Sequence, residues 1–227
     1  VGDPDTVVYL PFTSGTTGEP KGVLHTDNTL LANARTIAAD WHFSSASRIY
    51  TMSPLSHNLG FGALISAIAV GGELILHDLP KGESLLSRLR DTGTTFLFGV
   101  PTHAIDLLAE MRRDGGELPD LAGFRISGAA VLDVICAELL DHGITPQSGY
   151  GMTEACSHHY TLPDDPPARI TGTSGTACSG YEVRVFAQDD PNREAAVNEI
   201  GQIGGRGSSL MLGYFEDVAA TAASFST

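Results

Sequence analysis

Residues 12–23 read Phe-Thr-Ser-Gly-Thr-Thr-Gly-Glu-Pro-Lys-Gly-Val, a run that combines small hydroxyl side chains, glycines and one lysine. The run follows the apolar residues 7–10, which are typical of a β-strand. Glycines let backbone N–H groups close on an anion, and the hydroxyls and Lys21 add further donors. We therefore predict a loop that holds a polyphosphate at the end of a strand.

Two other interpretations of this loop fit less well. A run rich in Gly, Ser and Thr is often a flexible linker, but Pro20 and Lys21 make this one stiff and charged. The ordinary nucleotide P-loop has Gly immediately before its Lys and Ser or Thr immediately after it. Pro20 and Gly22 stand at those positions here, so that motif is excluded.

The composition is ordinary for a globular chain of 227 residues, with 42% apolar and 18% charged residues. Cys136, Cys156 and Cys178 lack the spacing of metal ligands and are expected to be reduced thiols. We find no signal peptide and no apolar run of about 20 residues, so a cytoplasmic protein without a transmembrane segment is expected. The formal net charge of −14 argues against nucleic acid and acidic membranes as partners.

Beyond the loop, the hydrophobic pattern alternates between strand and helix. Helices are expected over residues 30–41, capped by Thr26 or Asp27, and over residues 64–70, 84–90, 105–112 and 132–140. Strands are expected over residues 49–52, 74–76, 95–100, 124–127 and 144–148. This alternation predicts an α/β fold with parallel βαβ units over residues 1–166. Residues 167–227 are Gly-rich with short strands, which predicts the start of a small β-rich, barrel-like subdomain.

The loop resembles the signature of the adenylate-forming, or AMP-binding, superfamily of acyl-CoA synthetases, firefly luciferase and peptide-synthetase adenylation domains. A second family motif stands at residues 150–154, Tyr-Gly-Met-Thr-Glu, and a looser third motif runs over residues 201–214. The third motif carries Gln202 and Gly205 where the family commonly has Glu and Val. The three motifs occur in the family's order and cover nearly the whole chain.

This resemblance implies a carboxylic acid:CoA ligase, in which MgATP and an acid give acyl-AMP and pyrophosphate, and CoA then displaces AMP. Two alternatives stay open: an adenylation domain that loads a carrier protein, and a nucleotide-binding fragment without turnover. The family continues to a ribose-binding Asp and a small C-terminal lid domain that are absent from this chain. The isolated chain is therefore expected to be inactive or feeble.

The resemblance also implies roles for individual residues. Lys21, Thr153 and Glu154 are the implied catalytic residues, with Glu154 holding Mg²⁺ and Thr153 bonding the α-phosphate. The implied ATP and AMP contacts are Thr13, Ser14, Gly15, Thr16, Thr17, Gly18, Lys21, Gly128, Ala129, Ala130, Tyr150, Gly151, Met152 and Thr153. The implied acyl pocket consists of His57, Phe61, Gly99, Val100, Ser127, Gly128, Gly149 and Gly151.

The nature of the acid is predicted only in part. Peptide-synthetase domains place an Asp near His57 to meet the substrate's amino group, and residues 48–77 of this chain contain no Asp. A plain carboxylic acid is therefore expected. The sequence does not name that acid, and it does not predict the oligomeric state.

Overall fold

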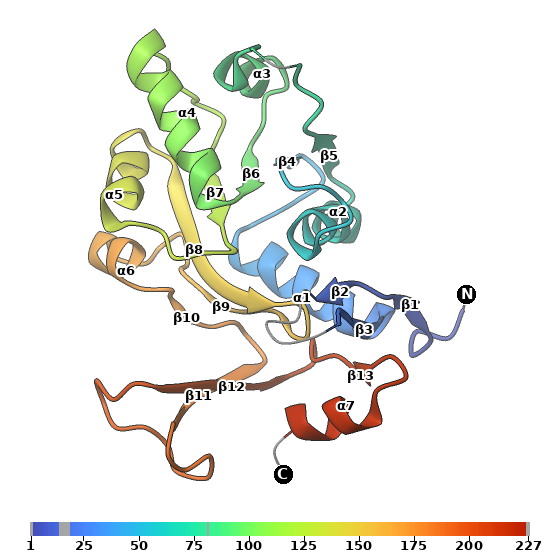
Figure 1. Cartoon of the computed structure of the whole chain (residues 1–227). Helices are drawn as coiled ribbons and strands as arrows, with labels where there is room; N and C mark the ends of the chain where they lie inside the picture. The colour runs from blue at the N-terminus through green and yellow to red at the C-terminus, as the bar shows by residue number, and fades with distance from the viewer. Residues whose placement is uncertain (1, 14–18, 81, 226–227) are drawn as a thin grey trace.

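The computed structural model of the chain describes residues 2–13, 19–80 and 82–225, and its centre is a seven-stranded sheet (Figure 1). The strands lie in the order β10-β9-β8-β7-β6-β4-β5. Their bounds are β4 Arg48–Thr51, β5 Glu73–Leu76, β6 Phe96–Gly99, β7 Gly123–Ile126, β8 Thr145–Met152, β9 Cys156–Tyr160 and β10 Thr176–Ala177. Strands β5, β4, β6, β7 and β8 run parallel, whereas β9 and β10 add antiparallel pairs at one edge. The predicted α/β fold with a parallel sheet is confirmed.

Helices cover both faces of this sheet. Their bounds are α1 Asp27–Asp40, α2 Asn58–Val70, α3 Leu85–Asp91, α4 Pro101–Asp114, α5 Asp133–Asp141 and α6 Pro167–Gly172. One core cluster packs α3, α4 and α5 against the face that carries Tyr50 of β4. A second cluster packs α1 and α2 against the face that carries the neighbouring Ile49. Successive strand residues point to opposite faces, so the sheet is buried on both sides, as parallel sheets generally are.

Three element boundaries lie four or more residues from the sequence-based expectation. Helix α2 begins at Asn58 rather than at residue 64, because His57 caps it by accepting a hydrogen bond from the Leu59 N–H at 3.2 Å. Helix α4 begins at Pro101 rather than at residue 105, because proline suits the first helical position. Strand β8 extends beyond residue 148 to Met152, because its second half pairs antiparallel with β9.

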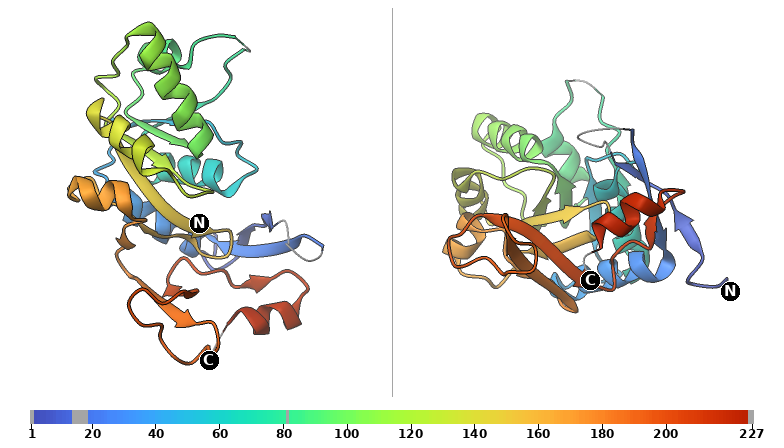
Figure 2. Two further views of the ribbon diagram at one scale, coloured as in Figure 1. Left: turned by 60° about the vertical axis from the view of Figure 1, so that its left-hand side comes forward. Right: turned by 60° about the horizontal axis from the view of Figure 1, so that its bottom comes forward.

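The N-terminal strands form a separate antiparallel sheet that the end of the chain completes. Its bounds are β1 Val7–Tyr9, β2 Phe12–Thr13, β3 Lys21–Thr26 and β13 Gly213–Tyr214. The antiparallel ribbon of β11 Tyr181–Ala187 and β12 Gly201–Gly207 precedes β13, and α7 Val218–Ser224 follows it. Figure 2 shows this ribbon and α7 on the side of the molecule away from α3 and α4. The division at residue 167 stays a prediction.

Within the described part of the chain, none of the helices is both long and apolar enough to span a membrane.

Candidate active site

The second sequence motif forms a hairpin turn at the end of the longest strand. Thr153 and Glu154 lie in the turn between β8 and β9, where the Ala155 N–H donates to the Met152 carbonyl at 3.1 Å. A Cβ on Gly151 would lie 2.3 Å from the carbonyl oxygen of Cys156 on the facing strand. Only glycine lets the two strands approach this closely, so Gly151 fixes where the Thr-Glu pair projects.

A buried histidine, His25, makes a hydrogen bond to the backbone of this turn. His25 of β3 is fully buried, and its Nε2 lies 2.7 Å from the carbonyl oxygen of Thr153, while its Nδ1 lies 3.0 Å from Thr29 Oγ1. Burial lowers the pKa of His25, so its imidazole is neutral at neutral pH. Nε2 therefore carries the proton and donates to Thr153. His25 acts as a positioning residue for the turn.

The third motif meets the first two at Glu154. The Tyr214 hydroxyl donates to Glu154 Oε1 at 2.7 Å, and the Met211 N–H donates to the Glu154 carbonyl at 2.8 Å. Lys21 Nζ lies 5.0 Å from the centroid of the Tyr214 ring, within the range of a cation–π interaction. Tyr214 also pairs with Val23 across β13 and β3. One tyrosine thus joins the lysine of the first motif to the carboxylate of the second.

The surroundings of Glu154 suit Mg²⁺ shared with a phosphate. Mg²⁺ prefers oxygen ligands and is usually bound through one or two carboxylates together with substrate phosphates. Tyr214 anchors one carboxylate oxygen of Glu154. The described residues contain no cluster of three or more His, Cys, Asp or Glu side chains that could hold a metal. Glu154 would offer Mg²⁺ a carboxylate that Tyr214 holds in place.

The structure describes only the two ends of the loop at residues 12–23 that is predicted to hold phosphates. Ser14, Gly15, Thr16, Thr17 and Gly18 lie outside the described residues. Thr13 on β2 pairs with Lys21 on β3, so the hairpin brings both ends of the loop together.

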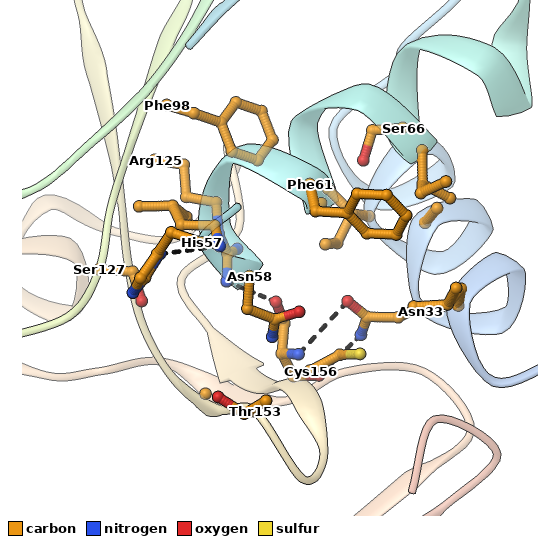
Figure 3. Close-up of a pocket in the computed structure, with 18 of the residues that line it drawn as sticks. Asn33, His57, Asn58, Phe61, Ser66, Phe98, Arg125, Ser127, Thr153 and Cys156 are labelled. Atoms are coloured by element: carbon orange, nitrogen blue, oxygen red, sulfur yellow. Dashed lines mark hydrogen bonds between the residues drawn. The ribbon is translucent and has the colours of Figure 1, made fainter. Parts of the chain in front are cut away.

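A cavity of about 170 Å³ opens beside the hairpin turn, between the sheet and helices α1 and α2 (Figure 3). The predicted site residues in its wall are His57, Phe61, Ser127, Gly128, Gly151, Met152 and Thr153. The cavity thus joins the segment around His57 to the Thr-Glu turn. Its use as an acyl pocket stays a prediction.

Three residues of the implied acyl pocket, Gly99, Val100 and Gly149, do not line this cavity. A Cβ on Gly99 would lie 2.9 Å from His103 Nδ1, and one on Gly149 would lie 2.8 Å from Tyr160 Cβ. These two glycines make room for neighbouring protein atoms in the structure.

Three of the implied ATP and AMP contacts, Ala129, Ala130 and Tyr150, lie outside the cavity; the resemblance places Ala129 and Tyr150 beside adenine. Ala129 and Ala130 are exposed, Tyr150 is 39% exposed, and the Tyr150 ring stacks on His159 with the centroids 5.4 Å apart. Their contact with adenine stays a prediction.

Several wall residues were not expected from the sequence. They are Leu30, Asn33, Ala34 and Ile37 of α1, Ile65 and Ser66 of α2, Phe98 of β6, Arg125 of β7, and Cys156 and Ser157 of β9. The apolar spacing of residues 30–41 predicted a helix face that packs on the sheet, and part of that face also borders the cavity. Arg125 did carry a signal, since a charged residue inside the apolar strand 123–126 is unusual.

The buried His158 of β9 gives the fold a pH dependence. Burial, with a smaller effect of His159, lowers the pKa of His158 to about 4. A histidine in an unfolded chain has a pKa of about 6.5. Between about pH 6.5 and pH 4, His158 is therefore protonated in the unfolded state but neutral in the folded state, and this difference favours unfolding. We expect the free energy of unfolding to be highest above about pH 6.5 and to fall as the pH drops below that value. Urea midpoints at pH 7.5 and pH 5 measure the change.

The variant His158→Gln is expected to lose less stability than the wild type between these two pH values. The remaining loss comes from His25, His103 and His159, whose pKa values burial also lowers. His142, exposed at the end of α5, supplies the control variant His142→Gln. Equal pH slopes for wild type and His158→Gln would contradict this account.

Comparison with known proteins agrees with this arrangement of motifs. The sequence model of the family described as "AMP-binding enzyme" matches residues 1–215. The chain is 30% identical over 219 residues to the medium-chain fatty-acid–CoA ligase of Escherichia coli, covering 96% of this chain and 38% of the relative. It is 31% identical over 220 residues to a feruloyl-CoA synthase of Amycolatopsis, covering 96% of this chain and 44% of the relative.

A solved structure shares the fold. The o-succinylbenzoate-CoA synthetase of Bacillus subtilis superposes with a TM-score of 0.89 at 25% identity, over 99% of this chain and 45% of that one. The same enzyme has been solved with its acyl-adenylate intermediate, and that structure has a TM-score of 0.87. The chain spans less than half the length of these relatives. The family match and the meeting of its three motifs at one site lead to one conclusion: the chain belongs to the AMP-binding enzyme family.

Proposed function

We propose that the protein containing this chain activates a carboxylic acid with ATP and transfers the acyl group to coenzyme A. The observation that carries this proposal is that Lys21, Tyr214 and Glu154 converge on the turn whose Thr153 lines the cavity together with His57. The relatives named above are CoA ligases or synthetases, which supports CoA as the acceptor.

In the first step, a carboxylate oxygen attacks the α-phosphorus of ATP, an acyl-AMP forms and pyrophosphate leaves. Both reactants are anionic, so the site must overcome charge repulsion and align the attack. Lys21 would neutralise phosphate charge, and the Thr153 hydroxyl would donate to the α-phosphate. The bound Mg²⁺ on Glu154 would supply further charge stabilisation to the phosphate oxygens. His57 and Phe61 would hold the acid with its carboxylate toward Thr153.

In the second step, the CoA sulfur attacks the acyl carbonyl carbon, and AMP leaves with the electrons of the broken C–O bond. The chain's role here is to keep the acyl group in the cavity and away from water. Transfer to a carrier-protein thiol would use the same first step, so a carrier protein is the alternative acceptor.

The test is acid-dependent exchange of labelled pyrophosphate into ATP, measured with aromatic, alicyclic, fatty and amino acids on the full-length protein. Exchange that needs an acid supports adenylation, and CoA-dependent release of AMP then separates CoA from a carrier protein as acceptor. Nucleotide binding without exchange with any acid would favour a binding-only protein.

We expect Thr153→Val to lower the exchange rate by about 10- to 100-fold. A hydrogen bond to a charged oxygen is worth about 1.5–3 kcal/mol, and valine matches threonine in shape while lacking the hydroxyl. Thr6→Val, at an exposed position before β1, is the control and should exchange at the wild-type rate. Wild-type exchange by Thr153→Val would remove this residue from the proposed mechanism.

A further inference from the structure

A buried arginine stands in the wall of the cavity. Arg125 is only 3% exposed and lies on β7 between Phe124 and Ile126, which both pack into the core cluster with α3, α4 and α5. Because strand residues alternate between faces, Arg125 points to the opposite side, toward α1 and α2. Figure 3 shows it beside His57 and Asn58 in the cavity wall.

The guanidinium of Arg125 has neutral partners only. Nη1 donates to Gln147 Oε1, Nη2 donates to Ser157 Oγ at 2.5 Å, and the Tyr160 ring centroid lies 5.7 Å from its central carbon. Among the described residues, no carboxylate lies within 4.0 Å of it. A guanidinium carries five N–H donors, and these bonds occupy two of them.

The charge of Arg125 persists at neutral pH despite its burial. Burial lowers its pKa to about 10, which still leaves the group protonated. Leaving a charge buried without an opposite charge is costly, so proteins pair such groups. An anionic occupant of the cavity would supply the missing opposite charge.

A second polar group in the wall is also without a partner. Ser66 of α2 is 1% exposed, lines the cavity, and its Oγ has no hydrogen-bond partner among the described residues. An aliphatic acyl chain would leave both Ser66 and the free donors of Arg125 unsatisfied. A carboxylate at the far end of the acid would satisfy the free donors of Arg125.

We propose that the cavity selects a short dicarboxylic acid, whose far carboxylate pairs with Arg125 while its near carboxylate is the one adenylated. This inference rests on the proposed function. Ser127 follows Arg125 by two residues on the same face of the chain, about 6.6 Å along an extended strand, and lies nearer the Thr-Glu turn. A cavity of about 170 Å³ is close to the about 150 Å³ of an apolar cavity that holds benzene, which suits a compact acid.

The experiment measures pyrophosphate exchange on the full-length protein with malonate, succinate, glutarate and adipate, each beside its monomethyl ester. The ester keeps one carboxylate and nearly the same shape but lacks the second negative charge. We expect kcat/KM for the best diacid to exceed that of its ester by about tenfold or more, mainly through KM. Arg125→Met should bring this ratio to within about twofold of one.

The matched control is Arg112→Met, on an exposed arginine of α4 paired with Glu138 at the surface, and it should leave the ratio unchanged. If no acid supports exchange, the proposed function fails. If monocarboxylates and esters exchange as well as diacids, the function stands and this inference is overturned. Should Arg125→Met not fold, the diacid-to-ester ratio of the wild type still decides between these outcomes.

Discussion

Glu154→Gln is expected to lower kcat/KM for acyl-AMP formation by about 100-fold or more. The substitution removes the negative charge that would hold Mg²⁺ against the phosphates, and such metal contacts supply several kcal/mol of transition-state stabilisation. The amide oxygen can still accept the hydrogen bond of Tyr214, so the free energy of unfolding should change by less than about 1 kcal/mol. Pyrophosphate exchange measured across Mg²⁺ concentrations, with urea unfolding of the same samples, checks both expectations.

The control for Glu154→Gln is Glu182→Gln, which removes a carboxylate from the surface of β11, where it pairs with Arg184 and Arg206. Exposed ion pairs contribute little, so both exchange and stability should remain close to wild type. If Glu154→Gln keeps more than half of the wild-type exchange rate at limiting Mg²⁺, Glu154 does not hold the metal.

Gly60→Ala is expected to destabilise the protein by about 2–3 kcal/mol and to lower exchange with every acid. Gly60 lies in the first turn of α2, where an added Cβ would lie 2.3 Å from the carbonyl oxygen of Pro54 and 2.5 Å from that of Ser53. Main-chain atoms cannot rotate away, so the helix or the preceding segment must shift, and overpacking of this kind costs about 1–3 kcal/mol or more. Such a shift would carry His57 with it. Urea unfolding and pyrophosphate exchange measure the two effects.

Gly62→Ala, two residues further along the same helix, is the matched control. A Cβ there meets no atom within 4 Å. Alanine favours helix over glycine by up to about 1 kcal/mol, so this variant should be as stable as the wild type or more so. Equal stability of the two variants would contradict the close packing of α2 on residues 53–54.

Much of the fold could be predicted because local pattern and global packing agree. The short apolar runs around Tyr50, Leu97 and Phe124 became parallel strands, and the amphipathic spacing of residues 30–41 became α1. Prediction failed where tertiary contacts outweigh local preference. The first turn of α2 contains Gly60 and Gly62, which disfavour a helix locally, yet close packing of Gly60 on the preceding segment accommodates it.

The candidate site also contains residues that the sequence predicts and residues that only the folded structure brings in. Thr153 and Glu154 stand in a contiguous motif and could be predicted from the sequence. Their supports could not, since His25 lies 128 residues from Thr153, and Tyr214 lies 60 residues from Glu154. The role proposed for Arg125 also depends on which face of β7 it occupies and on which helices lie opposite. These contacts arise only in the folded chain, so the sequence alone does not predict them.

Strand β8 pairs with a different neighbour along each half. Its first half runs parallel to β7, and its second half pairs antiparallel with β9 and leads into the Thr-Glu turn. The walls of the cavity on the far side come instead from α1 and α2. In the proposed function the groups that meet the phosphates come from the turn after β8, whereas α1 and α2 supply the opposite wall of the cavity. If the cavity holds the acid as proposed, substitutions at Leu30, Ile37 or Ile65 would reshape the space for the acid while leaving the turn with Thr153 and Glu154 in place.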